Sequence, residues 1–292
     1  MPVNVWLSLL IPAFEYPLGV TRILDRMHAS AASGIECLIS DDSRSDDVEL
    51  AVLAHPLHRE GKVAYTRNRP ALGAVHNWNE LLSRASGEYV VLMHHDECPE
   101  HDDFFLRLRA VLAEPIATDV LILDCLLPCF DRQRLRRHMP ICVKRQLVWW
   151  SASHLLRHNT VGPPSVVVAR RELCGNFDTR LRWLVDVDWM RQIFLNAGAR
   201  IKFSDELGVV SLHNGVESIT AAIRQELPRL RRVEAAIVQA ATSRIPVMRL
   251  LLPLGAGERL VAIGEQACWT LFRALVQLVG LATSRRAPEW LR

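Results

Sequence analysis

The chain has 292 residues, of which 50% are hydrophobic and 23% charged, with a formal net charge of +3 at pH 7. This length and apolar fraction can supply a sizeable core, so a largely disordered chain is excluded. The net charge is too small to indicate nucleic-acid binding, and no stretch reaches the ~18 uninterrupted apolar residues that predict a membrane span.

Short apolar runs alternate with helical patterns over the first 125 residues. The runs at residues 5–11, 35–39, 63–65, 90–93 and 120–125 predict strands. Helical spacing of apolar residues predicts helices between them, at residues 18–32, 48–54, 74–84 and 104–112. This alternation is typical of a doubly wound α/β domain with a mostly parallel sheet.

The pattern is looser in the second half of the chain. Strands are expected at residues 165–169, 201–203 and 209–212, and a helix at 188–196. After residue 216 the texture changes to long helical segments that carry Arg and are interrupted by Pro228, Pro246 and Pro253. We therefore predict an α/β domain over residues 1–215 and a helical C-terminal extension over residues 216–292.

The C-terminal extension contains an amphipathic pattern at residues 258–282, with Arg273 beside its apolar positions. A basic helix of this kind could lie on an anionic membrane surface. It could equally pack on the first domain or on a second copy of the chain, as in a homodimer. These alternatives stay open at the sequence level.

The cysteines and the N-terminus bear on the compartment. Seven cysteines are scattered without a CxxC pair, which fits neither a zinc site nor a disulfide framework. No basic segment followed by a cleavable apolar stretch opens the chain, so no export signal is expected. The sequence therefore predicts a cytoplasmic protein, placed at the inner face of the cell membrane if the extension contacts lipid.

Residues 89–97 carry the most informative pattern of the chain. An apolar strand stops abruptly at His94, His95, Asp96 and Glu97. Ligands of open α/β sheets bind at the carboxyl ends of strands, so this cluster is a candidate site. The alternative is a polar turn that follows a core strand and is simply solvated.

Further polar clusters follow other predicted strands or open helices. They are Pro12 to Glu15, Asp41 to Ser43, and Asp186 to Asp188. Carboxylate oxygens are the ligands that Mg²⁺ and Mn²⁺ prefer, so Asp96 with Glu97 could hold such an ion and leave it open for a diphosphate. Asp186 or Asp188 could then serve as general base. Neither a P-loop nor a GxGxxG motif is present.

Six segments occur in the order expected of one family. They are Leu9 to Glu15, Asp41-Asp42-Ser43, the Asn68, Gly73 and Asn77 segment, Ala85 to Glu97, the run from Gly162 through Gly175-Asn176-Phe177-Asp178 to Leu184-Val185-Asp186-Val187-Asp188-Trp189, and His213 with Ser218 and Thr220. With them the chain resembles glycosyltransferase family 2 over about residues 5–220. The resemblance implies a GT-A fold and an inverting enzyme that uses nucleotide-diphosphate sugars.

The resemblance also implies roles for individual residues. Phe14 and Asp42 would hold the nucleotide base, in a pocket that Pro12, Glu15 and Asn68 complete. Asp96 would contact the ribose or a Mn²⁺ or Mg²⁺ cofactor, whose other ligands would come from Glu97, His95 and His213. Asp186 would be the catalytic base. Trp183, Asp188 and Trp189 would lie toward the acceptor or the sugar.

The chain departs from the family pattern at three positions. His94 stands where the first acid of the Asp-x-Asp motif is usual, Glu97 replaces its last Asp, and Val185 replaces the acid before the base. Imidazole binds Mn²⁺ more readily than Mg²⁺. The choice of metal ligands among His94, His95, Asp96 and Glu97 therefore stays open.

The function expected from the resemblance is transfer of a sugar from a UDP- or dTDP-sugar to a saccharide or lipid-linked acceptor, in bacterial surface polysaccharide synthesis. Two alternatives remain. A metal-dependent hydrolase could use the cluster from His94 to Glu97, and a carbohydrate-binding protein could have lost its catalytic site, as the departures at His94 and Val185 suggest. No nucleic-acid partner is expected.

Overall fold

The computed structural model describes residues 5–129, 133–197, 200–212, 225–241, 270–272, 274–279, 281 and 284–291. Its strands are β1 (Leu7–Ala13), β2 (Ile35–Asp41), β3 (Val63–Arg67), β4 (Tyr89–Leu92), β5 (Glu97–Pro99), β6 (Val120–Pro128), β7 (Arg134–Arg137), β8 (Val167–Arg170), β9 (Ile201–Ser211) and β10 (Arg285–Arg286). Its longer helices are α1 (Pro17–Ser30), α2 (Asp47–Ala54), α4 (Ala74–Arg84), α5 (Phe104–Leu112), α6 (Ile141–Trp150), α7 (Val185–Ala197) and α9 (Leu227–Ala241). Short helical turns are α3 (Pro56–Arg59), η1 (Ala152–Leu156), η2 (Pro164–Val166), η3 (Arg171–Leu173) and η5 (Glu289–Leu291).

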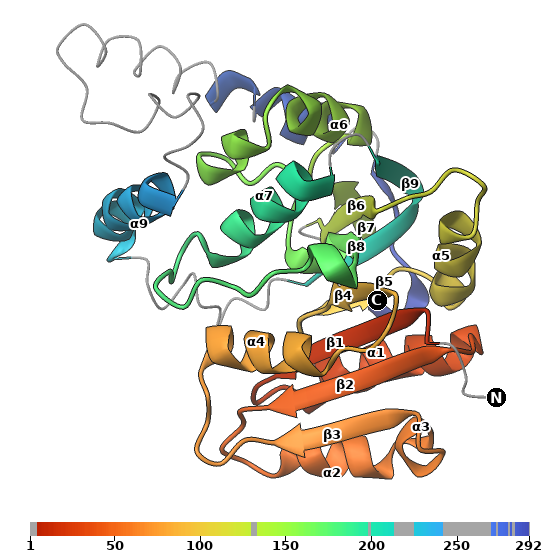
Figure 1. Cartoon of the computed structure of the whole chain (residues 1–292). Helices are drawn as coiled ribbons and strands as arrows, with labels where there is room; N and C mark the ends of the chain where they lie inside the picture. Colours follow the sequence, from red (N-terminus) through yellow and green to blue (C-terminus); the bar gives the residue numbers. More distant parts are fainter. Residues whose placement is uncertain are drawn as a thin grey trace, which may run out of the picture.

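The N-terminal half forms a parallel sheet in the order β4-β1-β2-β3. Helix α4 packs on β1 and β2 from one face, while α1 and α2 lie on the other face (Figure 1). Burial on both faces explains why β1 and β4 read as continuous apolar runs rather than as alternating patterns. The register sets Leu10 opposite Leu92 and Ala13 opposite Asp41, so the polar segments that follow these strands begin at one edge.

The second half of the sheet is built around β6. Strand β8 pairs antiparallel with both β4 and β6, and so joins the two halves into one ten-stranded sheet of the described residues. Strand β9 runs parallel to β6 and antiparallel to β5. The two late strands that the sequence predicts at 201–203 and 209–212 are one strand, whose pairing with β6 shifts register between Ile122 and Asp124.

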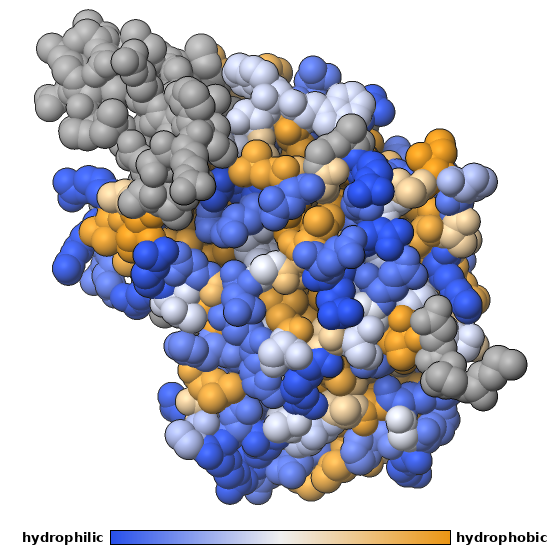
Figure 2. Space-filling view, viewed as in Figure 1, coloured by the Kyte–Doolittle hydropathy of each residue, from blue (hydrophilic) through white to orange (hydrophobic). Residues whose placement is uncertain are grey.

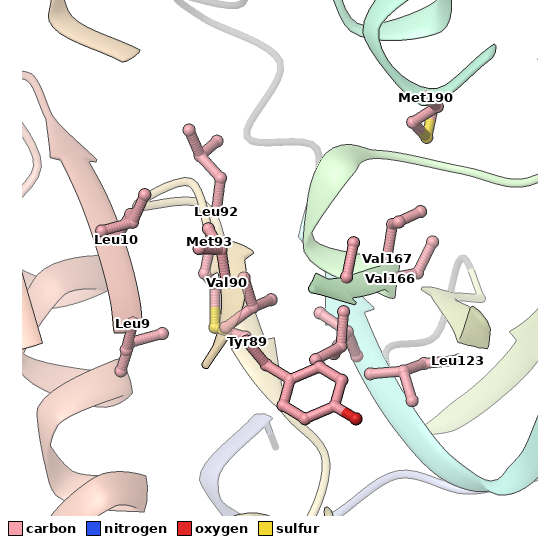
Figure 3. Packing of buried hydrophobic residues seen from close by; sticks show 14 of the residues in the cluster. Leu9, Leu10, Tyr89, Val90, Leu92, Met93, Leu123, Val166, Val167 and Met190 are labelled. Carbon is pink, nitrogen blue, oxygen red and sulfur yellow. The ribbon is translucent and has the colours of Figure 1, made fainter. Parts of the chain in front are cut away.

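The core is continuous across the two halves of the sheet. In Figure 3 the side chains of β4, among them Val90, lie between Leu9 and Leu10 of β1 on one side and Val166 and Val167 on the other. All five are fully buried. This packing fixes the carboxyl end of β4, where the candidate site begins. In the lower part of Figure 2, where β2, β3 and the helices next to them lie, the surface residues are mostly hydrophilic.

The C-terminal extension does not form a separate helical unit in its described parts. Val238 of helix α9 packs in the main hydrophobic core, and β10 adds to the sheet by pairing antiparallel with β7. Trp290 then lies under the guanidinium groups of Arg22 and Arg26 of α1, 5.8 and 5.4 Å from its ring centre. The predicted boundary at residue 216 lies outside the described residues. No helix in the described parts of the chain is long and apolar enough to cross a membrane.

Candidate active site

The ends of β1, β2 and β4 bring three of the predicted polar clusters to one edge. The backbone N–H of Met93 donates to Leu10 at 2.8 Å, so the chain leaves β4 directly beside β1. Asp42 donates from its backbone to Ala13 at 3.0 Å, which continues the β1–β2 contact one residue past the strands. The segments at Pro12 to Glu15, Asp41 to Ser43 and His94 to Glu97 therefore share this edge, as the parallel topology requires.

Asp41 and Asp42 have different surroundings. Asp41 is fully buried and accepts hydrogen bonds from the backbone N–H of Ser43 at 2.8 Å and from the Tyr65 hydroxyl at 2.7 Å. Burial and the bond to Asp41 raise the pKa of Tyr65. Asp41 thus stabilises the loop after β2 from its buried side. Asp42, in contrast, is directed toward the loop that follows β3.

Asp42 joins the end of β2 to the loop after β3. One carboxylate oxygen accepts from the Asn68 side chain at 2.8 Å and from the Leu72 backbone at 3.0 Å, and the other accepts from the Gly73 backbone at 2.8 Å. Asn68 also donates to the hydroxyl of Ser40 at 2.9 Å. Asp42 and Asn68, both predicted to bind nucleotide, are therefore in direct contact and hold the segment that precedes α4.

Glu15 fixes the loop on the other side of Asp42. Its carboxylate accepts from the backbone N–H of Arg44 at 2.7 Å and from the Ser45 hydroxyl at 2.8 Å, and its own N–H donates to the Ser43 hydroxyl at 2.7 Å. The bond from Arg44 is the main cause that lowers the pKa of Glu15. Phe14, between this loop and β1, is half-buried. These contacts join the loop after β1 to the loop after β2.

Three side chains beyond β4 form a group that could hold a metal ion. His94, Asp96 and Glu97 each offer one ligand atom, and these atoms lie within 4.8 Å of one another. Nε2 of His94 is buried and has no hydrogen-bond partner among the described residues. One imidazole with two carboxylates is a donor set that Mn²⁺ accepts, and an orphaned ring nitrogen fits a ligand better than a structural histidine. The residues therefore fit a divalent cation.

The charge state of His94 depends on its acidic neighbours. Burial alone pushes the pKa of His94 down, but the Glu97 carboxylate, 3.3 Å from Nδ1, and the further acids Asp96 and Asp186 more than offset it. The net effect is a raised pKa. A dense negative field of this kind is suited to a cation, and a bound cation would take the place of the imidazole proton.

His95 lies outside this group. Its Nδ1 is 3.2 Å from the Pro12 carbonyl, and its ring meets Tyr16 edge-on at 5.9 Å. Burial lowers its pKa. The sequence left the metal ligands open among His94, His95, Asp96 and Glu97, and the turn that follows β4 groups His94 with Asp96 and Glu97. Pro12 contributes its backbone to this contact and is itself buried.

Asp186 reaches the same region from the far part of the chain. It lies in the first turn of α7, and its Oδ1 accepts from the backbone N–H of Val187 at 2.8 Å. Burial raises its pKa to about 6, and the charges of His94 and Glu97 both act on it. A carboxylate with this pKa, beside a candidate metal group, is suited to accept a proton near neutral pH.

The two residues of α7 that were predicted to lie toward the acceptor or the sugar are buried. Asp188 is 5% exposed, and its carboxylate accepts hydrogen bonds from the side chains of Arg191 and Gln192, both at 2.7 Å. These bonds within α7 stabilise the helix. Trp189 is 2% exposed, stacks on Phe177 at 4.7 Å between ring centres and donates to a backbone carbonyl. Helical spacing turns both side chains toward the core, and their place beside the acceptor or the sugar stays a prediction. Trp183, before the helix, is half-buried.

Two predicted features receive no structural account. His213 lies outside the described residues, as does most of the amphipathic pattern at 258–282.

One acid in a described part of the extension was missed by the sequence reasoning. Glu234 of α9 is buried, and its carboxylate bonds to the backbone just before α7. A single Glu within a helical pattern carries no signal of this kind.

Comparison with known proteins agrees with the geometry. The model of glycosyl transferase family 2 matches residues 8–168, more than half of the chain. The chain belongs to this family. No curated protein matches it.

Solved structures similar to this chain are glycosyltransferases of the GT-A fold, which confirms the predicted fold. TarS of Staphylococcus aureus, solved as residues 1–349 with UDP-GlcNAc, has a TM-score of 0.58 and 15% identity over 79% of this chain and 66% of its own. The chain thus spans slightly less than two thirds of that solved fragment, and 39% of the chain in a second TarS structure. The mannosyltransferase PcManGT of Pyrobaculum calidifontis, with GDP-Man and Mn²⁺, has a TM-score of 0.58 and 15% identity over 94% of this chain and 85% of its own. Glucosyl-3-phosphoglycerate synthase of Mycobacterium tuberculosis, with Mn²⁺ and UDP, has a TM-score of 0.51 and 18% identity over 80% and 79%.

Proposed function

We propose that the protein is an inverting glycosyltransferase that moves a sugar from a UDP- or dTDP-sugar to a saccharide or lipid-linked acceptor. The observation that carries the proposal is the meeting of Asp186, with its pKa raised to about 6, and the group formed by His94, Asp96 and Glu97. The setting that we propose, bacterial surface polysaccharide synthesis on the inner side of the cell membrane, rests on the family resemblance.

The nucleotide would bind along the edge formed by β1, β2 and β4. Phe14 offers an aromatic face and Asp42 a carboxylate that can accept from a base N–H, although three of its acceptor positions are already engaged by Asn68, Leu72 and Gly73. A carboxylate has about four such positions, so one remains for the base. This arrangement supports uracil or thymine, whose N3–H is a donor.

A divalent ion, Mn²⁺ or Mg²⁺, would be held by His94, Asp96 and Glu97, and when bound it supplies positive charge for the diphosphate. Asp186 accepts the proton of the acceptor hydroxyl as that oxygen forms the new bond to the anomeric carbon. The bond from the anomeric carbon to the diphosphate breaks, and its electron pair leaves with the nucleoside diphosphate. Attack from the opposite side inverts the configuration.

Calorimetry with UDP, dTDP and GDP, each with and without Mn²⁺, tests the donor and the metal together. The proposal expects metal-dependent binding of UDP or dTDP that is lost in Asp96→Ala and kept in Asp103→Asn, an exposed acid before α5. Binding of Mn²⁺ without any nucleotide would instead support a hydrolase. GDP-Man, named in one similar structure, belongs in the donor panel, and its selective turnover would correct the predicted base.

Turnover separates an enzyme from a binding protein that has lost its catalytic site. Release of nucleoside diphosphate from a panel of nucleotide sugars would be measured for the wild type and for Asp186→Asn. The proposal expects turnover in the wild type and its near loss in the variant, with nucleotide binding retained. Binding without turnover of any donor would support the decayed carbohydrate-binding protein.

A further inference from the structure

Glu234 of α9 reaches the start of α7, the helix that carries Asp186. Its side chain is 1% exposed. One carboxylate oxygen accepts from the backbone N–H of Arg182 at 2.8 Å, and the other accepts from Trp183 at 2.9 Å and Leu184 at 2.8 Å. In Figure 1 α9 lies beside the segment that leads into α7.

Three consecutive backbone donors on one carboxylate form an anion site made of main chain. A buried carboxylate is costly unless its charge is satisfied in this way, so Glu234 and the segment 182–184 depend on each other for their positions. A weaker link joins the same two segments at the surface, where Arg182 pairs with Glu226 at 3.0 Å.

The bonded segment stands immediately before the catalytic position. The carbonyl of Leu184 accepts from the N–H of Asp188 at 2.8 Å, so Leu184 is the residue at which α7 begins its hydrogen-bond ladder. Asp186 follows two residues later, in the first turn. Only Val185, which is already helical, separates the bonded Leu184 from Asp186.

We propose that Glu234 is a positioning residue that holds the first turn of α7 so that Asp186 faces His94 and Glu97. The inference rests on the proposed function, in which Asp186 is the base. It assigns the C-terminal extension a part in catalysis, because the side chain that fixes the base comes from α9 and not from the α/β domain.

The test compares Glu234→Gln with Glu226→Gln, the matched change at the surface link. Gln keeps the shape of Glu, but it replaces one accepting carboxylate oxygen with an amide NH₂. That group cannot accept from the backbone N–H groups of residues 182–184. We expect kcat for release of UDP from UDP-GlcNAc, or of GDP from GDP-Man, whichever the wild type turns over, to fall at least tenfold. The Kd for UDP with Mn²⁺ should stay within twofold. Glu226→Gln should leave both within twofold.

Two further measurements separate positioning from a merely structural role. In the Asp186→Asn background, Glu234→Gln should cause no further loss of turnover, because a residue that acts through Asp186 has nothing left to position. Amide hydrogen exchange should show lost protection at residues 182–188 in Glu234→Gln and wild-type protection in the parallel strands β1 and β2. If Glu234→Gln does not fold, Glu234→Asp, which keeps the charge and shortens the reach, takes its place.

The outcomes distinguish the two proposals. Wild-type kcat in Glu234→Gln with a strong loss in Asp186→Asn overturns the positioning role and leaves the proposed function standing. The same fold-loss in the presence and absence of Asp186 overturns it as well. Full turnover in Asp186→Asn overturns both. The exchange comparison needs no donor, so wild-type protection at residues 182–188 in Glu234→Gln overturns the inference even if neither donor is turned over.

Discussion

Nδ1 of His94 lies 3.3 Å from Oε2 of Glu97, and the same oxygen accepts a hydrogen bond from the backbone N–H of His94 at 3.0 Å. Glu97 therefore fixes both the main chain and the ring of the residue three positions before it. Since Nε2 of His94 is left without a partner among the described residues, the pair presents one imidazole nitrogen in a fixed orientation.

Glu97→Gln is expected to weaken Mn²⁺ binding by about tenfold or more in the presence of UDP, because the variant loses a negative ligand and releases the His94 ring. Calorimetric titration with Mn²⁺ measures this, with Asp103→Asn as the matched exposed acid. Unchanged Mn²⁺ affinity in Glu97→Gln would show that the ion is held elsewhere.

Asp186→Asn is expected to change stability with a definite pH dependence. The folded-state pKa, about 6, is above the ordinary value of 3.8, so the protonated acid is favoured by folding. Stability from this group is full below pH 3.8 and is lost as pH rises through about 6. Asn should therefore stabilise the protein at pH 7.5, by at most about 3 kcal/mol, and have no such effect near pH 4.

Urea unfolding of Asp186→Asn and the wild type at the two pH values measures that difference. In the wild type, kcat/KM should fall as pH drops through about 6, because the base must be ionised. An equal stability difference at pH 4 and pH 7.5 would mean that the carboxylate titrates normally in the folded protein.

Asp42→Ala is expected to destabilise the protein by about 2 kcal/mol, because the backbone N–H groups of Leu72 and Gly73 and the Asn68 amide lose their shared acceptor. UDP affinity should fall in the same variant, since both the base contact and the loop are lost. Asp47→Asn, an exposed acid at the start of α2, should change stability by less than about 0.5 kcal/mol. UDP affinity equal to that of the wild type in Asp42→Ala would remove Asp42 from the nucleotide site.

Gly19→Ala is expected to disturb the metal group from behind. A Cβ at Gly19 would lie 1.8 Å from the backbone oxygen of His95 and 2.5 Å from the Tyr16 ring, so α1 and the segment after β4 must move apart. We expect a loss of about 2 kcal/mol in stability and weaker Mn²⁺ binding. Gly175→Ala, where nothing lies within 4 Å, is the matched control. Unaltered Mn²⁺ binding in Gly19→Ala would mean that this contact does not set the geometry of the group.

The N-terminal half of the fold was predictable because its signals are local. The helices expected at 74–84 and 104–112 coincide with α4 and α5, and the strands expected at 35–39 and 120–125 are parts of β2 and β6. Apolar runs bounded by polar clusters mark buried parallel strands. Because these strands run in the same direction, the polar clusters that follow them lie at one edge of the sheet. This edge, with Asp42 and Asp96, is therefore accessible to sequence reasoning.

The rest depends on contacts between distant segments. The grouping of His94 with Asp96 and Glu97 depends on how the turn after β4 folds, so the sequence could only leave the choice between His94 and His95 open. Helix α7 begins at Val185 rather than at 188, which turns Asp188 and Trp189 inward. The bond of Glu234 to residues 182–184 spans about fifty positions, and no spacing within either segment announces it.

The pairing of β10 with β7 has a consequence for how copies of the chain can associate. The outermost strand at that end of the sheet is two residues long and consists of Arg285 and Arg286. So short a strand offers few backbone groups to an incoming chain, and two neighbouring positive charges repel an identical strand. Edge-to-edge growth of the sheet into a polymer is therefore disfavoured at this end.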